Sequence, residues 1–248
     1  MSIEMRDVSK GFGERLILDG ISLEVREGET LAVIGASGVG KSVLLKCIVR
    51  LLEVDAGSVH VDGQDVALLE RDELYDLRRR VGYVFQFAAL FDSMSVFDNV
   101  AMGLRRIGTP RDETVERVRD ALRLVEMEGY EDRLPAELSG GQRKRIGMAR
   151  AITTRPKYLL YDEPTTGLDP VTTAVIDELV LRMAGELGVT GLVVTHDMKS
   201  AYRVADQVAM LHGGRIRFQG TPEEIQRVED PVVRGFVEGR PDLAREVA

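Results

Sequence analysis

Residues 31–42 read Leu31-Ala-Val-Ile-Gly35-Ala-Ser-Gly-Val-Gly40-Lys41-Ser42, and this stretch decides the fold of the 248-residue chain. It begins with an apolar run typical of a buried strand, and 43–48 continues in the pattern of a helix. Between them stands G-x-x-x-x-G-K-S, whose glycines let successive backbone N–H groups point at phosphate oxygens. Lys41 supplies a cation for the β- and γ-phosphates, and the Ser42 hydroxyl can ligate Mg²⁺. Chance produces this pattern in roughly one or two such chains per hundred, so the sequence predicts a nucleoside triphosphate site.

The segments around this loop have two different patterns of apolar residues. Residues 21–25 and 59–61 alternate apolar and polar side chains, with turn pairs at Asp19-Gly20 and Asp62-Gly63, which predicts an antiparallel layer. Short continuous apolar runs separated by helical patterns predict parallel strands covered on both faces. These runs are 31–34, 81–85, 158–161 and 191–194.

From about residue 90 to 157 the alternation of strand and helix breaks down. Val115, Val118, Leu122 and Val125 repeat at helical spacing, and 140–154 also has a helical pattern, so we expect an inserted helical subdomain. A hairpin at Gly213-Gly214 precedes a last helix that starts near Thr221, and the polar end from about 229 to 248 is expected to be a tail. The predicted division is a core with its β layer (1–88 and 158–222), a helical subdomain (89–157), and a C-terminal helix and tail (223–248).

Charge and composition exclude several classes of function. The formal net charge of −8 gives no overall electrostatic footprint for nucleic acid or an anionic bilayer, although a local basic patch could still exist. Cys47 is the only cysteine, which excludes an internal disulfide and a thiolate zinc site. Uncharged runs such as 81–91 are far shorter than the roughly 20 residues that span a membrane, and Met1 leads into no secretory signal. We therefore expect a soluble cytosolic protein whose membrane role, if any, comes through a partner.

Two acids follow the apolar run 158–161. A buried parallel strand delivers its carboxyl end to the crevice where α/β sheets bind ligands. Asp162 would then hold the metal, and Glu163 would accept a proton from the attacking water. Asp-Glu-Pro could instead merely cap the next element, but the phosphate loop favours the functional interpretation.

Polar residues also end two other runs. Gln86 follows 81–85 and could orient water or complete a metal shell, although a single glutamine is usually only a surface residue. His196 follows 191–195, where presentation to phosphate and simple helix capping are equally plausible. His60 and His212 are expected to be structural.

Leu138-Ser139-Gly140-Gly141-Gln142 opens a helix. Ser139 and Gln142 have capping-box spacing, while two glycines at a helix start also form an anion site. Chance produces this pentapeptide on the order of once in a few thousand chains. With this motif in place, the chain resembles the ABC-transporter ATPase family over nearly its whole length.

The resemblance implies a P-loop NTPase (RecA-like) α/β core with an N-terminal antiparallel layer and an inserted helical subdomain, using ATP and Mg²⁺. It gives residues 138–142 to the family's signature, which contacts the ATP of the partner copy. It gives Gln86 to the Q-loop as a catalytic and metal-binding residue, Asp169 to the D-loop, His196 to the catalytic switch, and Ser42 and Asp162 to the metal. Phe12 matches the aromatic that stacks on adenine, although an aromatic this early in a chain is usually core. The implied nucleotide-binding set is Phe12, Gly35, Ala36, Ser37, Gly38, Val39, Gly40, Lys41, Ser42 and Val43.

The resemblance also implies partners. Two copies of the chain pack head to tail, so that Ser139 and Gly141 of one contact the γ-phosphate held by Lys41 and Ser42 of the other. Hydrolysis by Glu163 opens the pair, and the motion passes to multi-spanning permease subunits docked on the helical subdomain. The chain would then lie at the cytoplasmic face of the inner membrane, held there through the permease.

Finer features look like the phospholipid-trafficking (Mla, organic-solvent-tolerance) branch that serves Mce-domain proteins. They are the stretches 85–100, 41–45, 165–170 and 230–239, whereas 142–145 departs from that branch. The expected function is the ATPase of a phospholipid transporter with an Mce-type partner. The alternatives are the ATPase of a polar amino-acid or other solute importer and, more distantly, a non-transport ABC ATPase. The last is disfavoured because the chain has no coiled-coil or zinc insertion, no second cassette and a negative net charge.

Overall fold

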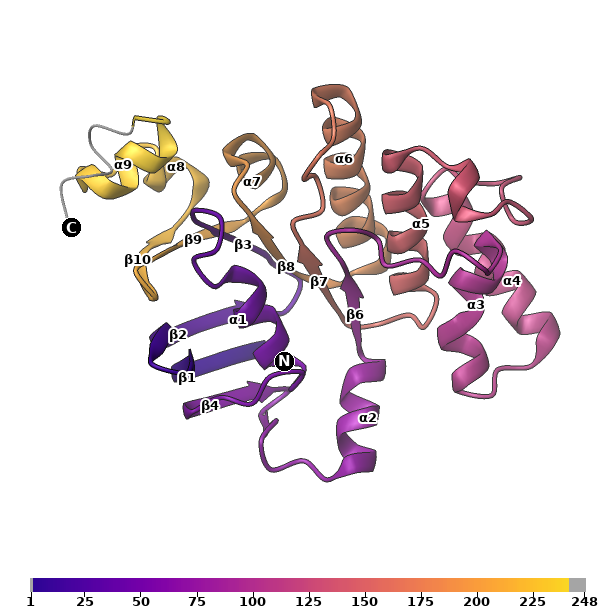
Figure 1. Ribbon diagram of the computed structural model, residues 1–248, viewed down its shortest axis with the longest axis horizontal. Helices are drawn as coiled ribbons and strands as arrows, with labels where there is room; N and C mark the ends of the chain where they lie inside the picture. Colours follow the sequence, from indigo (N-terminus) through magenta and orange to yellow (C-terminus); the bar gives the residue numbers. More distant parts are fainter. Residues whose placement is uncertain (1, 241–248) are drawn as a thin grey trace.

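The computed structural model describes residues 2–240, which form two sheets with helices around them (Figure 1). Residues 241–248, the end of the predicted tail, lie outside the described residues. The first sheet is antiparallel, and its strands are ordered β2-β1-β4-β5. These strands are β1 (Ser2–Phe12), β2 (Arg15–Arg26), β4 (Ala56–Val61) and β5 (Gln64–Asp65).

The second sheet carries the phosphate loop at the end of one of its central strands. Its order is β10-β9-β3-β8-β7-β6, with parallel pairing throughout except between β9 and β10. The carboxyl ends of β3, β6, β7 and β8 therefore meet at one edge, where ligands of α/β sheets bind. The strands are β3 (Thr30–Ile34), β6 (Val81–Val84), β7 (Tyr158–Asp162), β8 (Thr190–Thr195), β9 (Gln207–His212) and β10 (Arg215–Gly220).

Alternate residues of the central strands pack into different hydrophobic cores. Tyr158 and Leu160 of β7 face a core shared with the first sheet and the helix after the phosphate loop, whereas Leu159 and Tyr161 face a core built with the helical region. Every residue of β3, β7 and β8 is buried. Burial on both faces explains why these segments are continuous apolar runs and not alternating ones.

The helices surround the second sheet, and α3, α4 and α5 gather at one end of the molecule (Figure 1). All three fall within 89–157, and the division of the chain into domains stays a prediction. Among the described residues, no helix is long and apolar enough to cross a membrane. The helices are α1 (Lys41–Ile48), α2 (Arg71–Arg79), α3 (Val96–Arg106), α4 (Arg111–Leu124), α5 (Gly140–Ile152), α6 (Pro170–Leu187), α7 (Met198–Val204), α8 (Pro222–Ile225) and α9 (Pro231–Val237), with a 3₁₀ turn at Pro135–Glu137.

The predicted α/β class, with an antiparallel layer and inserted helices, is confirmed, but two local predictions are wrong. Asp19-Gly20 is not a turn between strands, because β2 runs through it and Gly20 adopts a φ of +63° at an irregular stretch of the β1–β2 pairing. The segment from 229 onward is not simply a tail, because α9 forms there. The Asp230 side chain caps α9, and Val232 and Val233 are buried in a third core.

Candidate nucleotide site

The phosphate loop, 35–40, connects β3 to the first turn of α1. Gly35 is required there, because a Cβ atom would collide with the carbonyl oxygen of Leu211. Gly40 ends the loop as the N-cap of α1 with a φ of +115°, a backbone conformation that favours glycine. The loop therefore delivers the N-terminus of α1, with its free N–H groups and partial positive charge, to the edge of the sheet.

Lys41 lies back over this loop as the first residue of α1. Its ammonium donates hydrogen bonds to the carbonyl oxygens of Gly35 at 2.8 Å and Ala36 at 3.0 Å. The same Nζ lies 3.1 Å from Oε1 of Glu163, and both side chains are buried. A bound phosphate would compete with the Glu163 carboxylate for this cation, which links phosphate binding to the position of the acid.

Ser42 and Asp162 form an oxygen pair beside Lys41. The Ser42 hydroxyl donates to Oδ1 of Asp162 at 2.6 Å, and the Tyr83 hydroxyl donates to Oδ2 at 3.0 Å. Burial and the Asp162 charge raise the pKa of Tyr83, so its hydroxyl remains a donor. A hydroxyl and a carboxylate are ligands that suit Mg²⁺, which usually takes its remaining ligands from phosphate and water. The donor set therefore fits this ion.

Glu163, the residue after β7, is held through both its backbone and its carboxylate. Its φ is +51°, and its N–H donates to the carbonyl oxygen of Val194 at 3.0 Å. Oε2 accepts a hydrogen bond from the Thr166 hydroxyl at 2.9 Å. Burial acts to raise the pKa of Glu163, but the Lys41 charge and the Thr166 hydrogen bond outweigh it and hold the pKa below its usual value. The carboxylate is therefore ionised at neutral pH and able to accept a proton.

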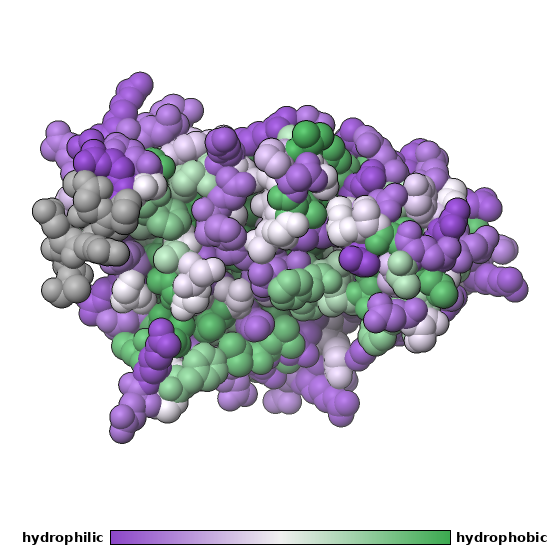
Figure 2. All heavy atoms as spheres, turned by 45° about the horizontal axis from the view of Figure 1, so that its top comes forward, coloured by the Kyte–Doolittle hydropathy of each residue, from purple (hydrophilic) through white to green (hydrophobic). Residues whose placement is uncertain are grey.

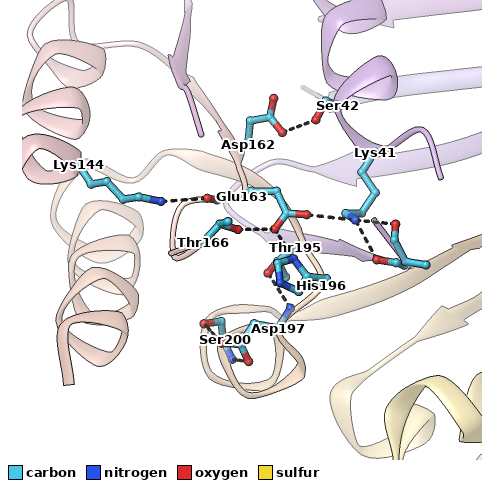
Figure 3. A network of polar contacts seen from close by, with 12 residues as sticks. Lys41, Ser42, Lys144, Asp162, Glu163, Thr166, Thr195, His196, Asp197 and Ser200 are labelled. Atoms are coloured by element: carbon cyan, nitrogen blue, oxygen red, sulfur yellow. Dashed lines mark hydrogen bonds and ion pairs between the residues drawn. The ribbon is translucent and has the colours of Figure 1, made fainter. Parts of the chain in front are cut away.

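His196 is brought to this acid from the end of β8. Its Nδ1 lies 2.7 Å from Oε2 of Glu163, while half of the side chain stays exposed. Figure 3 shows His196, Thr166, Lys41 and Lys144 approaching Glu163 from different parts of the fold. Of the two interpretations of His196, helix capping is not what the structure shows, and presentation to phosphate stays a prediction. The helix α7 is instead capped by Asp197, whose side chain accepts from Lys199 and Ser200.

The loop opens into a cavity of about 240 Å³. Phe12 and Gln86 lie in its wall together with Glu163, and the Phe12 ring is half exposed. Lys10 places its ammonium 5.6 Å from the centre of that ring. Of the predicted nucleotide-binding residues, those in the wall are Phe12, Ser37, Gly38, Gly40, Lys41, Ser42 and Val43. Gly35 and Ala36 contact Lys41 through their carbonyl oxygens, and Val39 packs against the first core.

Predicted signature and D-loop residues do not line this cavity in the described part of the chain. Ser139 and Gly140 are exposed at the start of α5, whereas Leu138 and Gly141 are buried. Ser139 forms the expected capping box: its N–H donates to Oε1 of Gln142 at 2.8 Å, and its Oγ accepts from the Gln142 N–H at 3.3 Å. Asp169 is exposed and caps α6, accepting from Val171 and Thr172. Ser139, Gly140 and Asp169 are thus free to face another molecule.

The cluster also contains residues that sequence reasoning did not select. Thr166 follows the acids within the quoted stretch 165–170, but nothing in its type marks it as a partner of Glu163. Tyr83 stands in an apolar run where its hydroxyl is the one polar group. Lys144 carried the clearest signal, because it shares a helical face with Gly141 and Met148, both buried.

The sequence of the chain is similar to those of known proteins. The family described as ABC transporter matches residues 18–166. The methionine import ATP-binding protein MetN of Brucella abortus (strain 2308) is 42% identical over 88% of this chain and 59% of its own length. The probable ribonucleotide transport ATP-binding protein mkl of Mycobacterium leprae (strain TN) is 38% identical over 97% of this chain and 70% of its own length. The chain thus spans only about three fifths of the length of MetN.

A solved structure is similar as well. It is the dimeric structure of a post-hydrolysis state of the ATP-binding cassette MJ0796 bound to ADP and Pi. Its TM-score is 0.80 at 32% identity, covering 89% of this chain and 98% of that chain. The order of the motifs, the phosphate loop on a buried parallel sheet and these likenesses agree: this chain belongs to the ABC transporter family.

Proposed function

We propose that the chain binds and hydrolyses ATP, as the motor subunit of a transporter. The observation that carries this proposal is the convergence at one sheet edge of a phosphate-binding cation, an oxygen pair and an ionised acid. Lys41 lies 3.1 Å from Glu163, and Ser42 lies 2.6 Å from Asp162. This combination is what phosphoryl transfer to water requires, because that reaction depends on positioning and charge stabilisation.

Each side chain then has a defined task. Lys41 and the loop N–H groups bind the β- and γ-phosphates, and Ser42 with Asp162 holds Mg²⁺, which neutralises phosphate charge when bound. Glu163 accepts a proton from the attacking water at its carboxylate, and Gln86 orients that water from the cavity wall. His196 fixes Oε2 of Glu163 and presents its exposed edge toward the γ-phosphate.

We further propose that two copies act head to tail, with Ser139 and Gly141 of one copy closing the phosphate site of the other. Support comes from the exposure of Ser139 and Gly140 away from the cavity of their own chain, and from the dimeric state of the similar cassette MJ0796. The exposed D-loop residue Asp169 is available for the same interface.

A test of the catalytic assignment is Glu163→Gln in the full chain. The contacts of Lys41 and Ser42 with the triphosphate remain, so ATP affinity should stay within a few-fold of wild type. Loss of the base should lower turnover by roughly 10²- to 10⁴-fold, and ATP should trap a dimer that size-exclusion chromatography detects. Lys41→Ala is the matched control and should instead abolish nucleotide binding. Unchanged hydrolysis in the Glu163 variant would remove this residue from the mechanism.

The cargo that we propose is phospholipid, moved through a multi-spanning permease with an Mce-type partner at the cytoplasmic face of the inner membrane, with no role for nucleic acid. The support is the resemblance of 85–100, 165–170 and 230–239 to the phospholipid-trafficking branch. Import of a small solute is the second candidate, favoured by the 42% identity to MetN.

Apolar side chains reach the surface in patches (Figure 2). On the segment after Gln86 they include Phe87, 82% exposed, and Phe91, 51% exposed, which suit a membrane partner.

Co-purification distinguishes the two cargoes. The tagged chain should bring down a multi-spanning subunit and an Mce-domain protein, and phospholipid bilayers should change its ATP turnover. A stable complex with an amino-acid permease would instead support solute import. Phe87→Ser should weaken capture of the permease without changing ATP affinity. Leu68→Ser changes a similarly exposed side chain (79%) in the turn between β5 and α2 and should not weaken that capture.

A further inference from the structure

Lys144 is a buried cation on α5, and only 8% of it is exposed. Figure 3 shows the side chain extending from the helix toward the backbone of Glu163. Its Nζ donates a hydrogen bond to the carbonyl oxygen of Glu163 at 3.3 Å, the one acceptor that the structure gives it within residues 2–240. Burial lowers the pKa of Lys144 to about 8, while the Glu163 charge acts in the opposite direction. Burying an ammonium costs free energy. A methionine at this position would therefore make the fold more stable, unless the hydrogen bond from the ammonium has a function.

The Glu163 backbone that Lys144 contacts is itself unusual. A φ of +51° is unfavourable for a residue with a Cβ atom, by roughly 1 kcal/mol or more, and persists only where the surroundings hold it. The N–H is held by Val194, and the carbonyl oxygen accepts from the Thr166 N–H at 3.3 Å as well as from Lys144. Thr166 belongs to the same turn as Glu163, so Lys144 is the contact through which the carbonyl oxygen is held by a different helix.

That helix is the one that begins with the signature. Ser139 caps α5, Gly140 is its first residue, and Lys144 follows Ser139 by five positions, or about 7.5 Å along the axis. A helix of this length moves as a rigid unit over so short a distance. A displacement of its exposed first turn therefore reaches the carbonyl oxygen of Glu163 directly.

We propose that Lys144 is a positioning residue that ties the signature helix to the base of the chain's own site, so that contact of the signature with nucleotide on the partner copy sets the position of Glu163. This inference rests on the head-to-tail arrangement proposed above. Its consequence is communication between the two sites of a dimer: each helix touches one nucleotide with its first turn and the acid of the other site with Lys144.

A purely structural role and a positioning role for Lys144 predict different ATP turnover in Lys144→Met. Lys144→Met keeps the length and volume of the side chain and removes only the charge and the donors. If Lys144 only filled space, this variant would be at least as stable as wild type and would turn over ATP at the same rate. If Lys144 positions Glu163, the variant should fold and bind ATP but hydrolyse it slowly.

The experiment measures steady-state MgATP turnover by the full chain as a function of ATP concentration. Lys144→Met should lower kcat by roughly 10- to 100-fold, the effect of a misplaced catalytic group, with KM within about threefold because the contacts of Lys41 are intact. Communication between the two sites raises the Hill coefficient of ATP turnover above one, so in Lys144→Met this coefficient should fall toward one. Lys144→Arg, which keeps a donor, should recover most of kcat. Arg143→Met removes an exposed cation from the same helical turn and should behave as wild type.

Two results would overturn the inference: wild-type kcat and Hill coefficient in Lys144→Met, or no recovery in Lys144→Arg when thermal unfolding shows it folded. If the methionine variant does not fold, the arginine variant decides. A kcat and a Hill coefficient near wild type support the inference, and a loss of both without a change in stability overturns it. Wild-type chain that binds but never hydrolyses MgATP would instead refute the proposed function, which separates the two failures.

Discussion

Asp177 is a buried acid on α6 whose ionisation should oppose folding at neutral pH. It is 4% exposed and accepts a hydrogen bond from the Ser200 hydroxyl at 3.1 Å. Burial raises its pKa to about 6 from the ordinary 3.8; the Ser200 hydrogen bond and Arg203 oppose the rise, and Asp197 and Glu178 add to it. Because the folded chain holds this proton more tightly than the unfolded chain, the protonated acid adds stability below pH 3.8 that is lost as the pH rises through 6.

Asp177→Asn removes this pH-dependent term. The amide stays neutral and its oxygen can still accept from Ser200, so the free energy of unfolding at pH 7.5 should rise by about 1–3 kcal/mol. The gain should be smaller at pH 5, where Asp177 itself is mostly protonated. Urea unfolding at the two pH values measures both quantities. Equal gains at both, or a loss at pH 7.5, would contradict the prediction.

At the residue scale, the sequence was enough to predict the residues whose position follows from a motif or a strand end. Lys41, Ser42, Asp162 and Glu163 fall in one cluster, as expected from the edge where parallel strands end, although their catalytic roles stay predictions. Thr166 could not be predicted, because its contact depends on how the turn after Glu163 folds. Tyr83 contacts Asp162 only through the register of β6 against β7, which no local pattern reveals.

The element α5 holds the segment after Gln86 in a strained shape. Ala88 and Ala89 have φ values of +59° and +49°, each unfavourable for alanine. Both carbonyl oxygens accept hydrogen bonds from the guanidinium of Arg150 at 2.6 Å. Ala88 also packs against Gly147, where an added Cβ would lie 3.2 Å from that of Ala88. The arginine and the close approach of the helix therefore keep the segment in place.

Arg150→Met should release this segment. Two charge-assisted hydrogen bonds are lost and two buried or strained carbonyl groups lose a partner, so the free energy of unfolding should fall by about 2–4 kcal/mol. Ala89→Gly in the same background should recover part of the loss, since glycine adopts positive φ without strain. Denaturant unfolding of the single and double variants provides the measurement. A loss below about 0.5 kcal/mol would show that Arg150 does not hold the segment.

At the element scale, prediction succeeded where one face or both faces of a segment are buried in a regular pattern. The central strands and the helices α4 and α5 follow from apolar periodicity alone. Asp62-Gly63 does join β4 to β5, but the similar pair Asp19-Gly20 lies within β2, because strand pairing with β1 continues past it. The helix α9 could not be predicted because it is only seven residues long. Its valines pack into a core whose other residues come from distant parts of the sequence.

The whole molecule carries the parts of its proposed reaction on separated elements. Figure 1 places α1, which follows the phosphate loop, and α5, which follows the signature, in different regions of the molecule. Glu163 and the phosphate loop share one cavity, and the signature residues are not part of its wall among the described residues. If the signature completes the site, as we propose, a complete site needs two chains, and a two-fold dimer would contain two such sites, each built from both copies.

Mixing two inactive variants tests this arrangement. Lys41→Ala destroys the phosphate loop. Gly140→Asp places a carboxylate at the exposed start of α5, where an added Cβ meets only Leu168 at 3.9 Å and a negative charge suits the helix N-terminus, so the fold is kept. In a mixed dimer one site carries both defects and the other carries none. Turnover should therefore recover on random mixing, to at most about a quarter of wild type, since half of the dimers hold one intact site of two. Coupling through Lys144 would lower this value, because the helix that holds Glu163 of the intact site faces the empty loop of the Lys41→Ala chain. If each chain completed its own site, the mixture would remain as inactive as either variant alone, and the signature would have no role across the interface.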